Sequence, residues 1–468
     1  MLFTQIEFLI LFISVLALIF LIKGHKAQKM ILLAASWYFY AYWDWRFFGL
    51  LLLSTVVDYS IGMGFAKITD NRKRRVLLWV SVITNLGILG FFKYYNFFIG
   101  SISQMLQPLG INTSTLSIIL PIGISFYTFQ TMSYTIDVYW RKLEPCKNFF
   151  DFALFVSFFP QLVAGPIVRA SDFLPQLKTP RQMSWDKTYS GARLIVIGFF
   201  KKSFIADHLA FFVDGVFRNP GVFDMGTTWL AVLAYAIQIY CDFSGYSDMA
   251  IGLARILGYE FNINFNLPYL AHSVEDFWRR WHISLSTWLR DYLYIPLGGN
   301  RKGRTRTYLN LIITMVLGGL WHGAAWTFVF WGAIHGGALA VSKFYSQIKH
   351  DAQRRVEGAG FRRFTGWAAT MLVVIIGWTF FRAQSFSDAV VILHKMFVNP
   401  AGIAWYPSFA VFTIAGFGIY YLTYALKLDW IPELSHHPRY SPVLLWSMVW
   451  VTVLFYPKNF QPFIYFQF

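Results

Sequence analysis

Long apolar runs alternate with short polar loops along the whole chain. Runs such as Phe8–Ile22, Phe48–Phe65 and Val76–Phe92 approach the roughly 20 helical residues that cross a bilayer, and comparable runs recur toward the carboxyl end. A buried core helix of a soluble protein has a shorter apolar stretch. The pattern therefore predicts an all-α integral membrane protein with about 10–12 transmembrane helices.

The composition excludes an ordinary soluble domain. Of 468 residues, 56% are hydrophobic and 13% are charged, whereas soluble domains have about 25% charged residues. The 19 Trp and 26 Tyr residues suit the headgroup region of a bilayer, where amphipathic rings concentrate. The first apolar run lacks a basic leading segment and a small-residue cleavage site, so we interpret it as a retained helix rather than a secretory signal.

The formal net charge of +17 is concentrated in loops. Four loops contain most of the clustered basic residues: Lys23–Lys29, Lys67–Arg75, Arg301–Arg306 and Lys349–Arg363. Basic loops beside apolar spans mark the cytoplasmic side, which predicts a periplasmic amino terminus. The same charge suits anionic lipid, so we expect membrane lipid as a partner and no nucleic acid.

We interpret residues 1–468 as a single polytopic membrane domain. Residues 1–115 and 341–468 read as plain spans and loops, whereas residues 120–340 mix apolar helices with glycine, proline and charged residues. A bilayer tolerates broken helices and charges only where they face protein or a wet cavity. The central part is therefore where we expect function, and its proline-glycine segment Leu120–Phe129 is a candidate re-entrant helix.

The stretch His272–Asn300 combines charged and aromatic residues. Ser273 is a candidate N-cap, and the spacing predicts one helix that places Trp278 and His282 on the same face. Arg279 and Arg280 would add cations to this helix. It would lie in the interface or line a polar funnel into the membrane; an interfacial anchor without chemistry remains an alternative.

His322 follows an apolar helix and is flanked by glycines in the sequence Gly318–Gly323, GGLWHG. An ionisable group at membrane depth is a functional candidate, and a neutral imidazole can take a proton from an attacking hydroxyl. His322 is thus the candidate general base, with a hydrogen-bonded structural histidine as the alternative. We rank His335 lower, as a buried histidine bonded to a neighbouring helix.

Other ionisable residues receive structural interpretations. Asp242 and Asp248 need partners at depth, which the arginines of the His272–Asn300 stretch could supply, and Lys201–Lys202 fits interface anchoring. Two cysteines, Cys146 and Cys241, are too few for a thiolate metal site, and no metal-ligand spacing of histidines occurs, so we expect no metal.

Five segments together resemble the membrane-bound O-acyltransferase family, in particular its bacterial branch of alginate O-acetyltransferases and their peptidoglycan, cellulose and teichoic-acid relatives. The segments are LPIGISFY (120–127), FPQLVAGP (159–166), DFSGYSDMAIG (242–252), FWRRWHISLS (277–286) and GGLWHGA (318–324).

The resemblance implies a ring of helices, with re-entrant and interfacial helices, around a thinned catalytic centre. It implies catalytic roles for His322 and His282, and it places Trp278, Arg279 and Arg280 in a donor funnel. Trp321 and Asn310 are expected as helpers that stabilise the oxyanion. The implied reaction carries an acetyl group from a cytoplasmic donor, acetyl-CoA, across the bacterial inner membrane, with no permanently bound cofactor.

The implied partners are a periplasmic protein of SGNH-hydrolase type and a polysaccharide synthase and export complex, because this chain has no Ser-His-Asp motif set of its own. The motifs do not identify the acceptor polymer, which would be alginate, cellulose, peptidoglycan or another polymer. A multi-span transporter or flippase is the main alternative, although related halves are not evident. A structural subunit that seats a synthase is a third possibility.

Overall fold

The computed structural model describes residues 1–109, 114–352, 359–426, 440–457 and 462–464, with side chains 347–359 and 440 left out. Within these ranges the regular structure is helical, apart from one isolated bridge between Phe223 and Ile403. The predicted all-α fold is confirmed. The chain groups into two compact units, one of residues 1–195 and 249–262 and the other of residues 196–248 and 263–468.

Besides the end of a helix that begins in the second unit, the described residues of the first unit form nine helices and most of a tenth. They are α1 (Ile6–Leu21), α2 (His25–Ala41), α3 (Phe48–Lys67), α4 (Asn71–Leu89), α5 (Tyr95–Leu106), α6 (Ile124–Tyr139), α7 (Phe149–Ser157), α8 (Phe159–Leu162), α9 (Ala170–Lys178) and α10 (Trp185–Phe199). Short 3-10 or π segments extend several of them: η1 (Trp45–Phe47), η2 (Gly90–Tyr94) and η3 (Gln107–Leu109).

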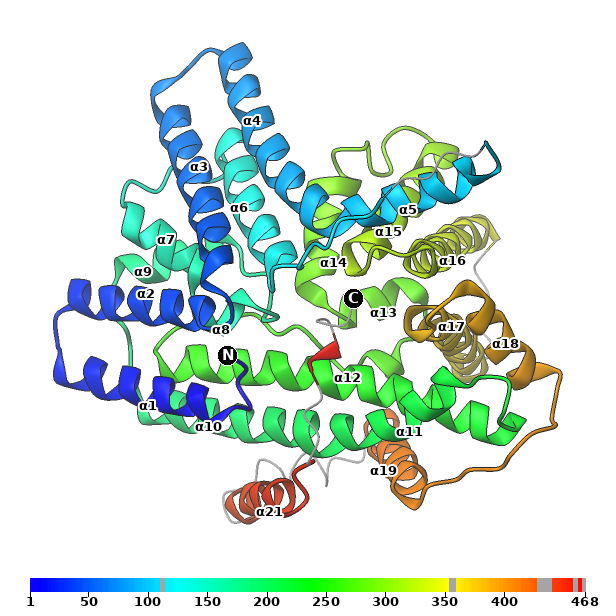
Figure 1. Ribbon diagram of the computed structural model, residues 1–468. Coiled ribbons are helices and arrows are strands. Elements are labelled where there is room, and N and C mark those ends of the chain that lie inside the picture. The colour runs from blue at the N-terminus through cyan, green and yellow to red at the C-terminus, as the bar shows by residue number, and fades with distance from the viewer. Residues whose placement is uncertain (110–113, 353–358, 427–439, 458–461, 465–468) are drawn as a thin grey trace. The chain divides into compact units, whose positions relative to one another are not determined.

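A polar network links α3, α4 and α6, which pack together (Figure 1). The buried Asp58 carboxylate of α3 accepts hydrogen bonds from Ser81, from Asn85 (2.8 Å) and from Thr135 (2.8 Å). Gly62 lies against the Tyr134 hydroxyl group, where any side chain would collide with the ring. Polar bonds and close approach of small residues are the usual means of joining helices in lipid.

The described residues of the second unit form a second set of helices. They are η4 (Phe200–Ala206), α11 (Asp207–Arg218), most of α12 (Met225–Ile256), η5 (Pro268–Leu270), α13 (Val274–Arg280), α14 (Ile283–Leu289), η6 (Arg290–Tyr294), α15 (Arg304–His322), α16 (Trp326–Ala352), α17 (Ala359–Arg382), α18 (Phe386–Phe397), α19 (Ser408–Ala425) and α21 (Tyr440–Leu454). Its buried core is rich in aromatic rings from α12, α13, α16 and α17.

Four described segments are long and apolar enough to span a membrane: Trp45–Lys67, Asn71–Leu109, Gly360–Arg382 and Ser408–Ala425. Helices α1 and α21 are apolar but shorter. Most of the basic segment Lys349–Arg363 lies outside the residues whose side chains are described.

Candidate active site

A break between α13 and α14 turns His282 into the protein interior. Ser273 caps α13 as predicted, with its Oγ accepting a hydrogen bond from the Asp276 N–H at 3.1 Å. Trp281 is then extended (φ −102°, ψ 128°), and His282 is left-handed (φ 43°, ψ 55°). The single helix predicted over His272–Asn300 is therefore wrong. As a result the His282 side chain is fully buried, at 0% exposure.

Asn264 holds this break in place. Its backbone carbonyl accepts from the Ile283 N–H (3.0 Å), and its Oδ1 accepts from the N–H (3.1 Å) and the Oγ (2.9 Å) of Ser284. These bonds satisfy the first N–H groups of α14, which a helix start leaves without an internal partner. They also offset the cost of a left-handed residue other than glycine, about 1–2 kcal/mol. The sequence motifs did not indicate Asn264.

His322 is the last residue of α15, and the glycines near it serve close helix packing. A Cβ on Gly319 would collide with the Phe328 carbonyl, and one on Gly332 with the Met315 carbonyl. Helix α15 and helix α16 thus approach backbone to backbone, side by side in Figure 1. Helix α16 fills the space beside these glycines, so both helices fix the position of His322.

The two motif histidines come together. The ring centres of His282 and His322 are 6.2 Å apart, and the Trp321 ring is 5.9 Å from His282 and 5.1 Å from His322. Phe243 of α12 packs edge-on against His282 at 4.5 Å. Only 3% of His322 is exposed, so its side chain lies almost entirely inside this unit.

Further aromatic rings pack on His322 and on one another. The Trp331 ring of α16 lies 5.1 Å from His322 on one side and 4.8 Å from His335 on the other. Trp278 contacts both Trp331 (5.7 Å) and His335 (5.3 Å). Two predicted site residues, His322 and Trp278, therefore belong to one continuous aromatic layer.

The other predicted residues lie farther from His322. Arg279 and Arg280 pair with Glu275 (2.6 Å) and Asp276 (2.9 Å) on their own helix, and the Arg279 pair is largely exposed. Asn310 is on α15 with His322 but twelve residues earlier, roughly 18 Å along the axis, and its amide donates to the Gly299 carbonyl at 2.9 Å. The structure does not place Asn310 beside the histidines. Asn310 is therefore too far away to stabilise an oxyanion that forms at His322.

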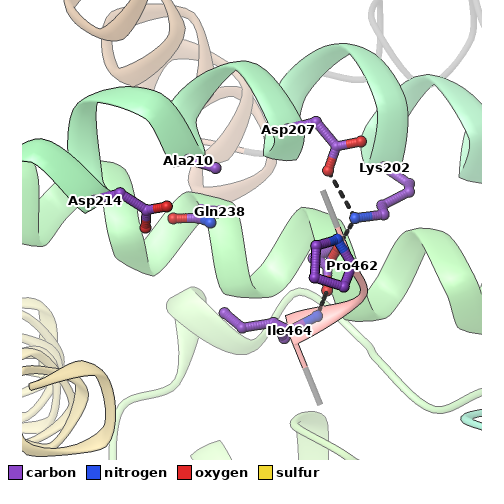
Figure 2. Close-up of a pocket in the computed structure, with 8 residues that line it drawn as sticks. Lys202, Asp207, Ala210, Asp214, Gln238, Pro462 and Ile464 are labelled. Carbon is purple, nitrogen blue, oxygen red and sulfur yellow. Dashed lines mark hydrogen bonds and ion pairs between the residues drawn. The ribbon is translucent and has the colours of Figure 1, made fainter. Parts of the chain in front are cut away.

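A second polar cluster lies in the same unit and is shown in Figure 2. The buried Lys202 Nζ contacts Asp207 and Asp242, each at 2.6 Å, beside a small cavity that Asp214 and Gln238 also line. Asp242 also accepts from the Ile464 N–H at 2.8 Å. The acids of α12 thus pair with lysines, Asp242 with Lys202 and Asp248 with Lys201 (2.7 Å). The predicted arginine partners, and interface anchoring by Lys202, were wrong.

No group of three or more His, Cys, Asp or Glu side chains in the described part of the chain is arranged to hold a metal ion. Both cysteines of the chain are free thiols.

Comparison with known proteins identifies the class. The model of the membrane-bound O-acyltransferase family matches residues 146–386, a range that contains both histidines. The chain belongs to this family, and it is a multi-pass membrane acyltransferase.

Relatives with assigned activities cover most of the chain. A probable alginate O-acetylase of Pseudomonas putida is 40% identical over 100% of both chains. A probable alginate O-acetylase of Pseudomonas aeruginosa is 44% identical over 85% of this chain and 75% of its own. A peptidoglycan O-acetyltransferase of Helicobacter pylori is 38% identical over 80% of this chain and 74% of its own.

Proposed function

We propose that this protein O-acetylates an exported bacterial polysaccharide, taking the acetyl group from acetyl-CoA on the cytoplasmic side of the inner membrane. The observation that supports this best is the meeting of His282 and His322 within the family-matched region. The printed activities of the three relatives, on alginate and on peptidoglycan, support a polymer of this kind as the final acceptor.

In the proposed reaction His322 is the general base. Its ring takes the proton of an acceptor hydroxyl while the hydroxyl oxygen attacks the thioester carbonyl. Collapse of the tetrahedral intermediate breaks the carbon–sulfur bond, and the proton passes from His322 to the leaving thiolate. The products are the acetyl ester and the free thiol of coenzyme A.

His282 and Trp321 would support this step by position. The ring centres of His282 and Trp321 lie 6.2 Å and 5.1 Å from that of His322, so their N–H groups are candidate donors to the developing oxyanion. Removing one such donor typically costs about 100-fold or more in rate. Exclusion of water by the surrounding rings would also limit hydrolysis of the thioester.

Arg279 and Arg280 are proposed to attract the phosphate-bearing donor. Each guanidinium group forms an ion pair with an acidic side chain on α13. Each arginine would leave this carboxylate to bind the phosphate of the donor. Arginine suits this because its fork binds phosphate oxygens in pairs. The proposed acceptor of the acetyl group is a serine of a periplasmic SGNH-type partner, or the polymer itself, in a complex with the synthase and export proteins.

The test uses detergent-purified protein with labelled acetyl-CoA and an acceptor. Wild-type protein should transfer acetyl or slowly hydrolyse the thioester, and His322→Ala should abolish both. His208→Ala is the matched control, because His208 bonds to the Phe204 carbonyl (2.8 Å) away from the site. Substrate flux in liposomes without acyl turnover would instead support a transporter, and polymer acetylation that persists in His322→Ala would support a structural subunit.

A further inference from the structure

His335 is a fully buried histidine that the proposed reaction does not use. It is 0% exposed, and neither ring nitrogen has a hydrogen-bond partner among the residues that the structure describes. The sequence-based expectation that it bonds to a neighbouring helix was wrong. A buried polar group without a partner costs about 1–3 kcal/mol, so such a group requires an explanation.

Two indole N–H groups beside His335 share this property. Trp278 Nε1 and Trp331 Nε1 are buried, and the described residues offer neither of them a partner. Their rings contact the His335 ring at 5.3 Å and 4.8 Å. Three polar side chains from α13 and α16 thus form one layer whose hydrogen-bonding capacity the described part of the chain leaves unused.

Gly377 of α17 faces the same nitrogens. A Cβ at this position would lie 2.8 Å from His335 Nε2 and 3.4 Å from Trp331 Nε1. The absence of a side chain therefore lets the backbone of α17 pack close to both nitrogens. This is a position where glycine permits close approach to a functional group.

The chemistry of the layer specifies its ligand. A neutral imidazole has one N–H donor and one acceptor nitrogen, and each indole adds one N–H donor. A secondary amide is complementary, since its carbonyl accepts from the indoles or the imidazole and its N–H donates to the remaining ring nitrogen. An apolar acyl chain would leave all of these groups without a bond.

The layer also lies at the right distance from the reacting group. Trp331 separates His335 from His322, with ring distances of 4.8 Å and 5.1 Å. In the arm of coenzyme A a sulfur and two methylenes separate the thioester carbonyl from the first amide, a span of roughly 5 Å at about 1.5 Å per bond. A thioester in contact with His322 would therefore place that amide beside Trp331, the ring that His335 and Trp278 also contact.

We propose that His335, with Trp278 and Trp331, binds the secondary amide nearest the thioester of the acyl donor and so positions the thioester at His322. His335 is a positioning residue in this scheme and exchanges no proton with the reacting atoms. The proposal rests on the proposed acyl transfer from a coenzyme A thioester, and it names the part of the donor that the site recognises.

A pair of small thioesters tests this directly. S-acetyl-N-acetylcysteamine keeps the amide, and an S-acetyl alkanethiol of equal length lacks it. Wild-type protein should prefer the amide-bearing thioester by about 10-fold or more in kcat/KM, because the analogue leaves buried polar groups unpaired. His335→Phe should reduce that ratio to about one through a higher KM for the amide-bearing thioester.

Two further variants separate binding from a structural role. His335→Gln retains a donor and an acceptor and should recover most of the preference. His208→Phe, outside the site, should leave it at the wild-type value. An equal preference in wild type and His335→Phe would overturn the proposal.

Thermal unfolding in detergent supplies a readout that needs no turnover. His335→Phe should raise the unfolding midpoint by about 1–3 °C, because it removes an unpaired polar group but keeps a ring. Pantetheine should raise the midpoint of wild type and of His322→Ala but not of His335→Phe. A lower midpoint in His335→Phe, or an equal pantetheine shift in all three, would contradict the proposal. A failure of the proposed function would instead appear as equal turnover in wild type and His322→Ala.

Discussion

The imidazole rings of His282 and His322 lie 6.2 Å apart between their centres, although 40 residues separate them in the sequence. Two local features bring them together. The break after α13 directs His282 inward, and the glycine-mediated packing of α15 on α16 fixes His322 at a helix end. Each feature can be changed without touching either histidine, which makes the geometry testable.

Replacement of Asn264 should misplace His282. Asn264→Ala removes the Oδ1 that accepts from Ser284, so the left-handed conformation of His282 loses support. We expect kcat to fall by about 10–100-fold, since a displacement of about 1 Å can cost 100-fold, with a smaller change in the amount of folded protein. Steady-state acetyl transfer by the purified variant measures this.

Asn266→Ala is the matched control for that variant. Asn266 is exposed, and its described hydrogen bonds, to Arg280, use only its backbone. It should retain wild-type activity. Equal activity of both variants would show that Asn264 does not position His282.

The packing of α15 against α16 should tolerate a methyl group at one glycine and not at its neighbour. A Cβ on Gly336 would lie 2.7 Å from the Ile312 Cα, whereas one on Gly337 meets nothing within 4 Å. Gly336→Ala should therefore destabilise the protein by about 1–3 kcal/mol, and Gly337→Ala should be neutral. Thermal unfolding of the two variants in one detergent provides the measurement, and an equal loss of stability in both would refute the packing account.

Replacement of Lys202 should destabilise the protein more than replacement of Lys201, which pairs with Asp248. Lys202→Met leaves the buried Asp207 and Asp242 carboxylates without their shared cation, and breaking a buried ion pair from one side costs about 3–5 kcal/mol. Lys201→Met should cost less, because the Lys201 and Asp248 side chains are 23% and 22% exposed. Comparison of unfolding midpoints tests this order, and a greater loss for Lys201→Met would contradict it.

The sequence predicted the membrane class and the helical fold better than it predicted local geometry. Hydropathy repeats along the whole chain, so the helices are evident, and Ser273 is evident as a cap from its residue type. The break at Trp281–His282 was missed because the polar and apolar pattern continues through it, and the residues that stabilise it, Asn264 and Ser284, do not form a spaced motif with His282.

The partners in the buried ion pairs could not be predicted from the sequence either. Lysine, arginine and aspartate at depth all require a counter-charge, but residue spacing does not say which one. The π-helical turn Phe200–Ala206 directs Lys202 toward Asp242, and a Cβ on Gly245 would collide with the Gly198 carbonyl, so α12 packs closely at this level. Which cation pairs with Asp242 therefore depends on tertiary packing and not on the local sequence pattern.

The most direct test of the proposed function is the ester-linked acetate on the exported polymer of cells that contain either wild-type protein or His322→Gln at equal membrane abundance. The account predicts that acetate falls to the level of cells without the gene, while the variant protein keeps the wild-type unfolding midpoint. Wild-type acetylation in His322→Gln cells would contradict a catalytic role for this histidine and, with it, the proposed reaction.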